Sequence, residues 1–205
     1  MPIPWMSWSD RRRWRSARTV ADLGELMAQW LERRISSRPG YTQRHGPDEE
    51  TEHLVPTLAA LCRAGYITTQ SQPGLAGTGV DGRWWQQRAM VDLVVTDAVA
   101  LARLLNAAGE AGMIVRVIDY GREGSPGPLV TVTTCAGHAT AWTGRRIGPQ
   151  DMALRWPGLT TGLYDQVAHG TYVSVVAPEY GHAGERLWPV LLDLARGLRR
   201  HDTHA

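Results

Sequence analysis

The sequence predicts a single α+β domain, with a mixed or mostly antiparallel sheet of about five or six strands and helices mainly on one face. Its 205 residues suffice for one substantial hydrophobic core but are few for two. Apolar residues recur at helical spacing in some segments and alternate in others, and the middle of the chain follows the order strand, helix, strand, strand. We therefore assign residues 1–18 to an N-terminal arm, 19–200 to the domain and 201–205 to a disordered tail.

Two helices are expected in the first third of the chain. Thr19 is placed to cap a helix that runs to about Ile35, because the apolar residues after it form one stripe. A second helix begins near Asp48, at an acidic run that suits the positive end of the helix dipole, and it stops at Gly65. Pro56 falls inside this second helix and is expected to bend it.

Strands dominate the rest of the chain. A strand over residues 65–70 ends in the turn from Ser71 to Gly74, and the glycine-rich residues 75–82 predict only a flexible loop. The other predicted strands are 86–95, 113–119, 129–135, 138–143 and 172–177, with a Gly/Pro-rich connection at 121–128 and helices after a Thr96 cap, at 151–156 and at 185–200.

Composition excludes several classes of protein. All 22 basic residues are arginine, so the chain has no lysine for a Schiff base, a pyridoxal anchor or a P-loop, and we predict no cofactor. The net charge of +2 provides no global field to recruit nucleic acid or an anionic membrane. The absence of Lys and Phe, with abundant Ala, Gly and Arg, indicates a high-GC genome of the actinobacterial kind.

The two cysteines bear on the cellular compartment. Cys62 and Cys135 could form one disulfide by number alone, but no signal peptide precedes the first charged run. No stretch reaches the roughly 20 apolar residues that a membrane helix needs. We therefore expect a cytoplasmic protein with two free thiols.

The turn that contains Ser71 and Gln72 is the first candidate ligand site. A hydroxyl and an amide at a strand end, next to a glycine that permits close backbone approach, are typical of ligand contacts. A solvated Pro-Gly turn is the alternative explanation.

A second candidate follows the glycine-rich loop. Arg83 and Arg88, with Trp85 between them, have the chemistry to clamp a flat or anionic ligand by paired hydrogen bonds and stacking. In the alternative, the tryptophans lie at the rim of the core and Arg88 pairs with Asp92 on the same strand face.

A candidate for chemistry lies between the last strand and the last helix. Glu179 and His182 are suited to act as an acid, a base or an orienting pair, and structural capping is the favoured alternative. The spacings of Cys135 with His138 and of Glu49 with His53 each provide only two ligands, so we predict no metal site.

The N-terminal arm has two interpretations. The arginines of residues 11–15, with Trp8 and Trp14, have the composition to stack on and neutralise a nucleic acid strand. The cluster is short and adjoins Asp10, which favours docking of the arm onto the protein's own surface or onto a partner.

Several segments together resemble a family of uncharacterised proteins common in Streptomyces and its relatives. They are residues 19–26, 63–66, the turn 71–74, Gln87-Arg88-Ala89, and residues 178–181 before Leu187-Trp188. The resemblance covers most of the chain and implies an actinobacterial cytoplasmic domain of unknown function, without any catalytic residue. In that family an Asn stands at the position of Cys62, and a Trp and an Arg stand at those of Tyr180 and His182.

The leading functional prediction is a ligand-binding or accessory protein. Arg83 and Arg88 would hold an anionic small molecule or partner, Ser71 and Gln72 would orient it, and a specialised-metabolism enzyme would be the associated protein. A small transferase or hydrolase that uses His182 and Glu179 is the alternative, so whether the protein is an enzyme stays open. Nucleic-acid binding by the arm is the third hypothesis, and the oligomeric state is not predicted.

Overall fold

A computed structural model describes residues 6–41, 46–119, 128–145 and 147–202. The expected α+β class and the antiparallel sheet are confirmed. The helical elements are α1 (Trp8–Ser16), α2 (Val20–Leu31), η1 (Glu49–Leu54), α3 (Val55–Arg63), α4 (Ala98–Glu110), α5 (Pro149–Arg155), α6 (Thr161–Ala168), η2 (Gly181–Arg186) and α7 (Leu187–Asp202). The strands are β1 (Tyr66–Gln72), β2 (Ala76–Thr78), β3 (Trp84–Val95), β4 (Ile114–Asp119), β5 (Val130–Cys135), β6 (His138–Thr143) and β7 (Thr171–Tyr180).

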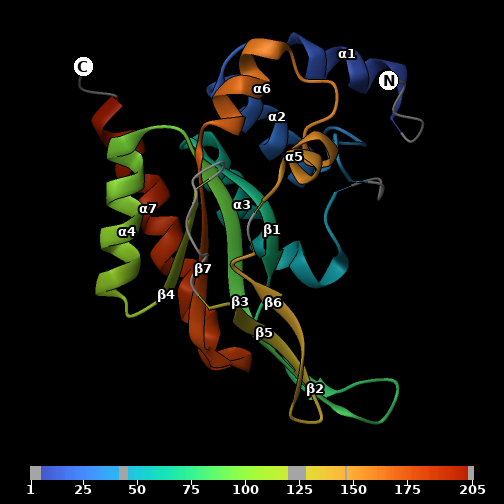
Figure 1. Ribbon diagram of the computed structural model, residues 1–205, viewed down its shortest axis with the longest axis vertical. Coiled ribbons are helices and arrows are strands. Elements are labelled where there is room, and N and C mark those ends of the chain that lie inside the picture. The colour runs from blue at the N-terminus through green and yellow to red at the C-terminus, as the bar shows by residue number, and fades with distance from the viewer. Residues whose placement is uncertain (1–5, 42–45, 120–127, 146, 203–205) are drawn as a thin grey trace.

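The long strand β3 organises the seven-stranded sheet, whose main path is β4-β7-β3-β5-β6. β1 pairs with the second half of β3, and β2 pairs with its start. In Figure 1, β2, β5 and β6 lie at one end of the molecule, and α1, α2, α5 and α6 gather at the other.

The alternation of side chains along β3 separates two apolar clusters. Ala89, Val91 and Leu93 belong to the large core that α2, α3, α4 and α7 cover, and Figure 1 shows α4 and α7 side by side there. Met90 lies on the opposite face in a smaller cluster with Val176 and the valines of β5. The alternation of residues 86–95 predicted a strand, and in the structure successive side chains of β3 do point to opposite faces of the sheet.

Several local predictions are wrong. The glycine-rich residues after Gly74 are not all loop, because β2 pairs with β3 next to Trp84 and Trp85. Gly77, Gly79 and Gly82 match the spacing G-x-G-x-x-G, but they join two antiparallel strands instead of a strand and a helix. They therefore do not form a dinucleotide-binding turn. β2 also brings the described sheet to seven strands, where the sequence predicted about five or six.

The second helix also differs from the prediction. Residues 49–54 form the 3₁₀ turn η1, and α3 begins only at Val55. Pro56 lies in the first turn of α3, where its missing N–H is not needed, so it starts the helix and does not bend it. Asp97, and not Thr96, caps α4, and its carboxylate accepts a hydrogen bond from the N–H of Ala100 at 2.7 Å.

The N-terminal arm contains a helix that packs on the protein's own surface. The indole N–H of buried Trp14 donates to the carbonyl of Ser37 at 2.8 Å, and Asp10 accepts hydrogen bonds from Ser36 and Ser37. Trp8 is exposed. At the other end α7 is described as far as Asp202, and the remainder of the expected tail lies outside the described residues, as do residues 121–127 of the predicted Gly/Pro-rich connection.

Candidate functional site

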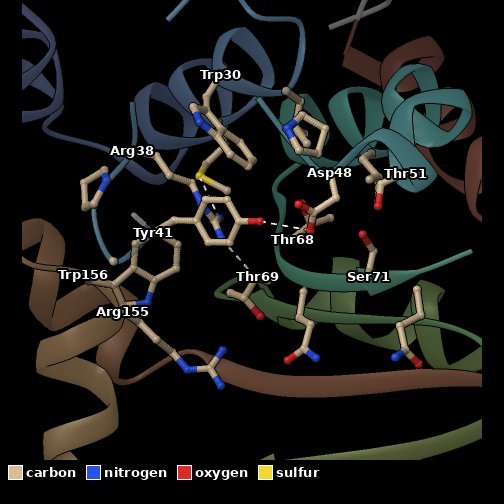
Figure 2. A pocket seen from close by; sticks show the side chains of 18 of the residues that line it. Trp30, Arg38, Tyr41, Asp48, Thr51, Thr68, Thr69, Ser71, Arg155 and Trp156 are labelled. Atoms are coloured by element: carbon tan, nitrogen blue, oxygen red, sulfur yellow. Dashed lines mark hydrogen bonds between the residues drawn. The ribbon is translucent and has the colours of Figure 1, made fainter. Parts of the chain in front are cut away.

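A cavity of about 540 Å³ opens beside the edge of β1. Its walls come from α2 and the nearby residues 38–41, from β1 and from the distant α5, and residues 47–51 also contribute. Figure 2 shows their side chains directed toward a common space. Because ligand cavities in proteins hold about 300–1,000 Å³, this volume suits a small molecule.

Arg38 is the central charged group of this cavity. Its guanidinium lies over the rings of Trp30 and Tyr41, at 4.5 and 4.8 Å from their centroids, and the two rings meet edge to face. One N–H donates to the carbonyl of Thr69 at 3.3 Å and another contacts the sulfur of Met27 at 3.9 Å. Burial lowers the pKa of Arg38 to about 10, which still leaves the side chain cationic at neutral pH.

Arg38 has no carboxylate partner among the described residues. The pairs found in the described ranges join acidic groups to other arginines or to His182. The Nε–H of Arg38 and the indole N–H of Trp30 are buried donors that meet no acceptor in this part of the chain. Since buried donors in proteins are almost always satisfied, these two orphaned groups call for a functional explanation.

Arg155 brings a second guanidinium to the same cavity from the end of α5. It forms no hydrogen bond or ion pair with the described residues, and its charge contributes to the lowered pKa of Arg38. Gly40 makes this approach possible. Its φ is +71°, and a Cβ there would lie 2.4 Å from the carbonyl oxygen of Arg155, so only glycine fits.

A β-bulge at Thr69 shapes the wall that faces the two arginines. The register of β1 against β3 shifts between Thr68 and Gln70, which leaves Thr69 as an extra residue. Its carbonyl therefore accepts from Arg38, and its hydroxyl donates to the backbone carbonyl of Asp92 at 3.2 Å.

Three acidic residues, Asp48, Asp151 and Glu50, also border the cavity, and two of them, Asp48 and Asp151, bond to other residues. Asp48 accepts a hydrogen bond from the hydroxyl of Tyr41 at 3.2 Å. Asp151 pairs with Arg145 and caps the start of α5. Glu50 is exposed at the rim. Burial, together with Asp48, raises the pKa of Tyr41, so its hydroxyl stays protonated.

A smaller cavity of about 160 Å³ shares Thr69, Gln70 and Arg155 with the first. Asp92 lies in its wall and accepts a hydrogen bond from the hydroxyl of Thr143 at 2.9 Å, which is itself 2.8 Å from the hydroxyl of Ser174. Burial raises the pKa of Asp92. The two cavities therefore meet at Arg155.

The structure brings Ser71 and Gln72 to the large cavity. Figure 2 shows the hydroxyl of Ser71 and that of Thr51 facing each other across the space. The amide of Gln72 donates to the hydroxyl of Thr133 at 3.1 Å, so its orientation is fixed by β5. Gly74, with a φ of +97°, packs closely against Ala89 and does not line the cavity, so the predicted ligand contact at this glycine stays a prediction.

The other predicted ligand residues lie elsewhere. Arg83 is exposed and pairs with Asp81 at 3.0 Å, and the indole of Trp85 donates to the same carboxylate. Arg88 lies over the ring of Tyr180 at 4.4 Å. Its suggested pairing with Asp92 does not occur, because Asp92 faces Thr143 and Ser174 instead. None of the three predicted residues lines the cavity that contains Ser71.

Glu179 and His182 have separate partners. Arg186 donates to both carboxylate oxygens of Glu179, at 3.1 and 3.0 Å, and holds the pKa of Glu179 below its ordinary value. His182 is exposed and lies 2.7 Å from the carboxylate of Glu185. The structure thus places these two predicted residues in two exposed ion pairs and not with each other.

The sequence interpretation missed the residues that form the charged centre of the cavity. The sequence analysis assigns Arg38 no role and places Arg155 only within the short helix predicted at 151–156. The available signal was an arginine in a loop between Trp30 and Tyr41, the pattern of a cation held between aromatic rings. No sequence signal connects that loop with Arg155.

Three further findings concern other functional classes. Cys62 and Cys135 are both free and buried. In the described ranges, no cluster of three or more His, Cys, Asp or Glu side chains is arranged to hold a metal ion. Among the described helices, none combines the length and apolar character needed to span a lipid bilayer.

Comparison with known protein families identifies the family of the chain. A family model described as a domain of unknown function, DUF6919, matches residues 9–197. This confirms the expectation of an uncharacterised family, while the actinobacterial origin stays a prediction. No curated protein matches the chain.

Proposed function

Because the chain belongs to the DUF6919 family of domains of unknown function, we propose its function from the cavity: it binds a small molecule by an anionic group that Arg38 and Arg155 hold. The observation that carries the proposal is the buried guanidinium of Arg38 without a carboxylate partner among the described residues. An uncompensated buried charge is costly, and such groups concentrate at functional sites.

The surroundings of Arg38 favour an anion as the ligand. Trp30 and Tyr41 hold the planar guanidinium in place, so little side-chain entropy remains to be lost on binding. A guanidinium with unused N–H groups suits carboxylate, phosphate or sulfate, which accept two parallel hydrogen bonds. Ser71 supplies a further polar group for orienting the ligand.

We extend the proposal to an accessory protein of a specialised-metabolism enzyme in an actinobacterial cytoplasm, with the bound anion as the shared ligand. Arg83, Trp85 and Arg88 are the alternative anion-binding group, and Arg83 is the one best placed for comparison because its exposed side chain pairs only with Asp81 among the described residues.

A matched pair of variants tests which arginines bind the anion. Isothermal titration calorimetry with inorganic phosphate and with sulfate is applied to the wild type, Arg38→Gln and Arg83→Gln. We expect Arg38→Gln to raise the Kd for the anion that binds by about tenfold or more, since a hydrogen bond to a charged group contributes about 1.5–3 kcal/mol. Arg83→Gln should leave the Kd unchanged. The opposite outcome would assign the site to the hairpin arginine, and absence of binding of either anion to the wild type would refute the proposal.

A further inference from the structure

Asp92 is a second ionisable side chain that is largely shielded from solvent and has no ion-pair partner among the described residues. It lies on the face of β3 turned away from the large core, in the wall of the smaller cavity. Among the described residues, no cation lies within ion-pair distance of its carboxylate, although the charge of Arg155 acts on it and opposes the rise in its pKa. Its direct partners are the hydroxyls of Thr143 and Ser174.

These hydroxyls cannot fill the hydrogen-bonding capacity of the carboxylate. Thr143 and Ser174 are 2.8 Å apart, so one hydroxyl proton is used whenever they bond to each other. That arrangement leaves a single proton for Asp92, whereas an ionised carboxylate has about four acceptor positions. Thr69 donates only to the backbone carbonyl of Asp92 and adds nothing to its side chain.

We propose that the ligand is a zwitterion, whose anionic group lies between Arg38 and Arg155 and whose ammonium group reaches Asp92 in the smaller cavity. The inference rests on the proposed function, because it uses the same anion site and adds the second charge. The chemical class is a small molecule with a carboxylate or a phosphate and a primary amine.

The arrangement of the cavities supports this class of ligand. Thr69, Gln70 and Arg155 border both cavities, so the two cavities are neighbours, and the proposal requires that one small molecule reaches from the first into the second past this shared wall. A ligand ammonium would donate to the open acceptor positions of Asp92 and compensate its charge, as the ligand anion compensates Arg38. Burial raises the pKa of Asp92 in the empty site, and a bound cation would lower it.

Two pairs of probes separate the ammonium group from the anion. Ethanolamine phosphate is compared with ethyl phosphate, and γ-aminobutyrate with butyrate, by calorimetry on the wild type. In at least one pair we expect the amine-bearing member to bind about tenfold more tightly, the effect of one charge-assisted hydrogen-bonded contact. Equal affinities within both pairs would overturn the zwitterion and leave the anion site standing. No binding by any of the four probes would refute both proposals.

A variant then assigns the preference to Asp92. Asp92→Asn keeps the side-chain shape and should abolish the difference between the two members of a pair without weakening the amine-free member. Asp165→Asn, at an exposed position on α6, is the matched control for charge and should keep the preference. A preference that survives Asp92→Asn would overturn the inference, and the wild-type comparison decides the matter by itself if this variant does not fold.

Discussion

The guanidinium of Arg38 donates to the backbone carbonyl of Thr69 at 3.3 Å, and Thr69 is the extra residue of a β-bulge. Thr69 has no partner in the register of β1 against β3, so its carbonyl is not used by this ladder. The bulge releases it to hold the arginine, and the hydroxyl of Thr69 ties the same residue to the backbone of Asp92. A local irregularity of the sheet therefore links the two ionisable side chains that define the proposed site.

Ser71 provides a test of the cavity wall. Its hydroxyl faces the cavity and forms no hydrogen bond with the described residues, so Ser71→Ala should remove a ligand contact without removing a structural one. We expect the affinity for the bound anion to fall by about 1 kcal/mol, and the free energy of unfolding to change by less than about 0.5 kcal/mol. Calorimetry and urea unfolding measure the two effects. Ser16→Ala, on α1, serves as the control that should leave affinity unchanged.

Gly40 tests the contact that brings Arg155 to Arg38. Gly40→Ala forces a side chain into a left-handed conformation, which costs about 1–2 kcal/mol, and its Cβ would also meet the carbonyl of Arg155 at 2.4 Å. We expect a loss of at least about 2 kcal/mol in urea unfolding, together with weaker anion binding.

Gly109 is the matched control for that substitution. It lies in α4 with open space where its Cβ would be, so Gly109→Ala should stabilise the protein by about 0.5–1 kcal/mol and leave anion binding unchanged. Equal effects of the two substitutions would contradict the role assigned to Gly40.

Glu32 makes stability depend on pH in the acid range. Hydrogen bonds from Arg63, with Arg34 in addition, lower the pKa of Glu32 to about 2 from the 4.5 of an unperturbed glutamate. A lowered pKa in the folded state stabilises the protein above the unfolded value and ceases to do so as pH falls through the folded one. The free energy of unfolding should therefore decrease as pH falls from 4.5 to about 2. Because Glu32 is partly exposed, solvent screening reduces the size of this effect.

Arg63→Met should weaken that pH dependence, because Arg63 joins α3 to both Glu25 and Glu32 of the preceding helix region. Urea unfolding at a series of pH values between 2 and 5 measures it. Arg83→Met removes an exposed arginine elsewhere and should keep the wild-type profile. An unchanged profile in Arg63→Met would show that the α2–α3 ion pairs do not contribute to acid stability.

His182 separates the binding protein from an enzyme. It is exposed, pairs with Glu185 and does not line either cavity, so His182→Ala should leave the affinity for the anion unchanged. The stability should change by less than about 1 kcal/mol, the usual range for an exposed ion pair. Loss of a turnover activity in this variant, with affinity intact, would instead support the transferase or hydrolase alternative.

Particular elements show how far sequence reasoning reached. The alternation over residues 86–95 predicted β3, and Thr19 predicted the start of α2, where a capping box with Asp22 satisfies the first N–H groups. β2 could not be predicted, because a glycine-rich segment has little intrinsic preference for a strand. It becomes one here by pairing with the start of β3 at Trp84 and Trp85. The sequence predicted the site in part. Ser71 and Gln72 line the cavity as expected, but the arginines that line it are Arg38 and Arg155 and not the predicted Arg83 and Arg88.

The sequence alone determined the α+β class, most of the helices and strands, and the absence of lysine chemistry, because periodicity, capping and composition are local properties of the chain. Only the tertiary structure decided which charged groups meet. Arg38 and Arg155 are more than a hundred residues apart and come together through the close approach of Gly40 to α5, and the bulge at Thr69 then connects Arg38 to Asp92. Such contacts depend on how elements pack in three dimensions, which no local pattern records.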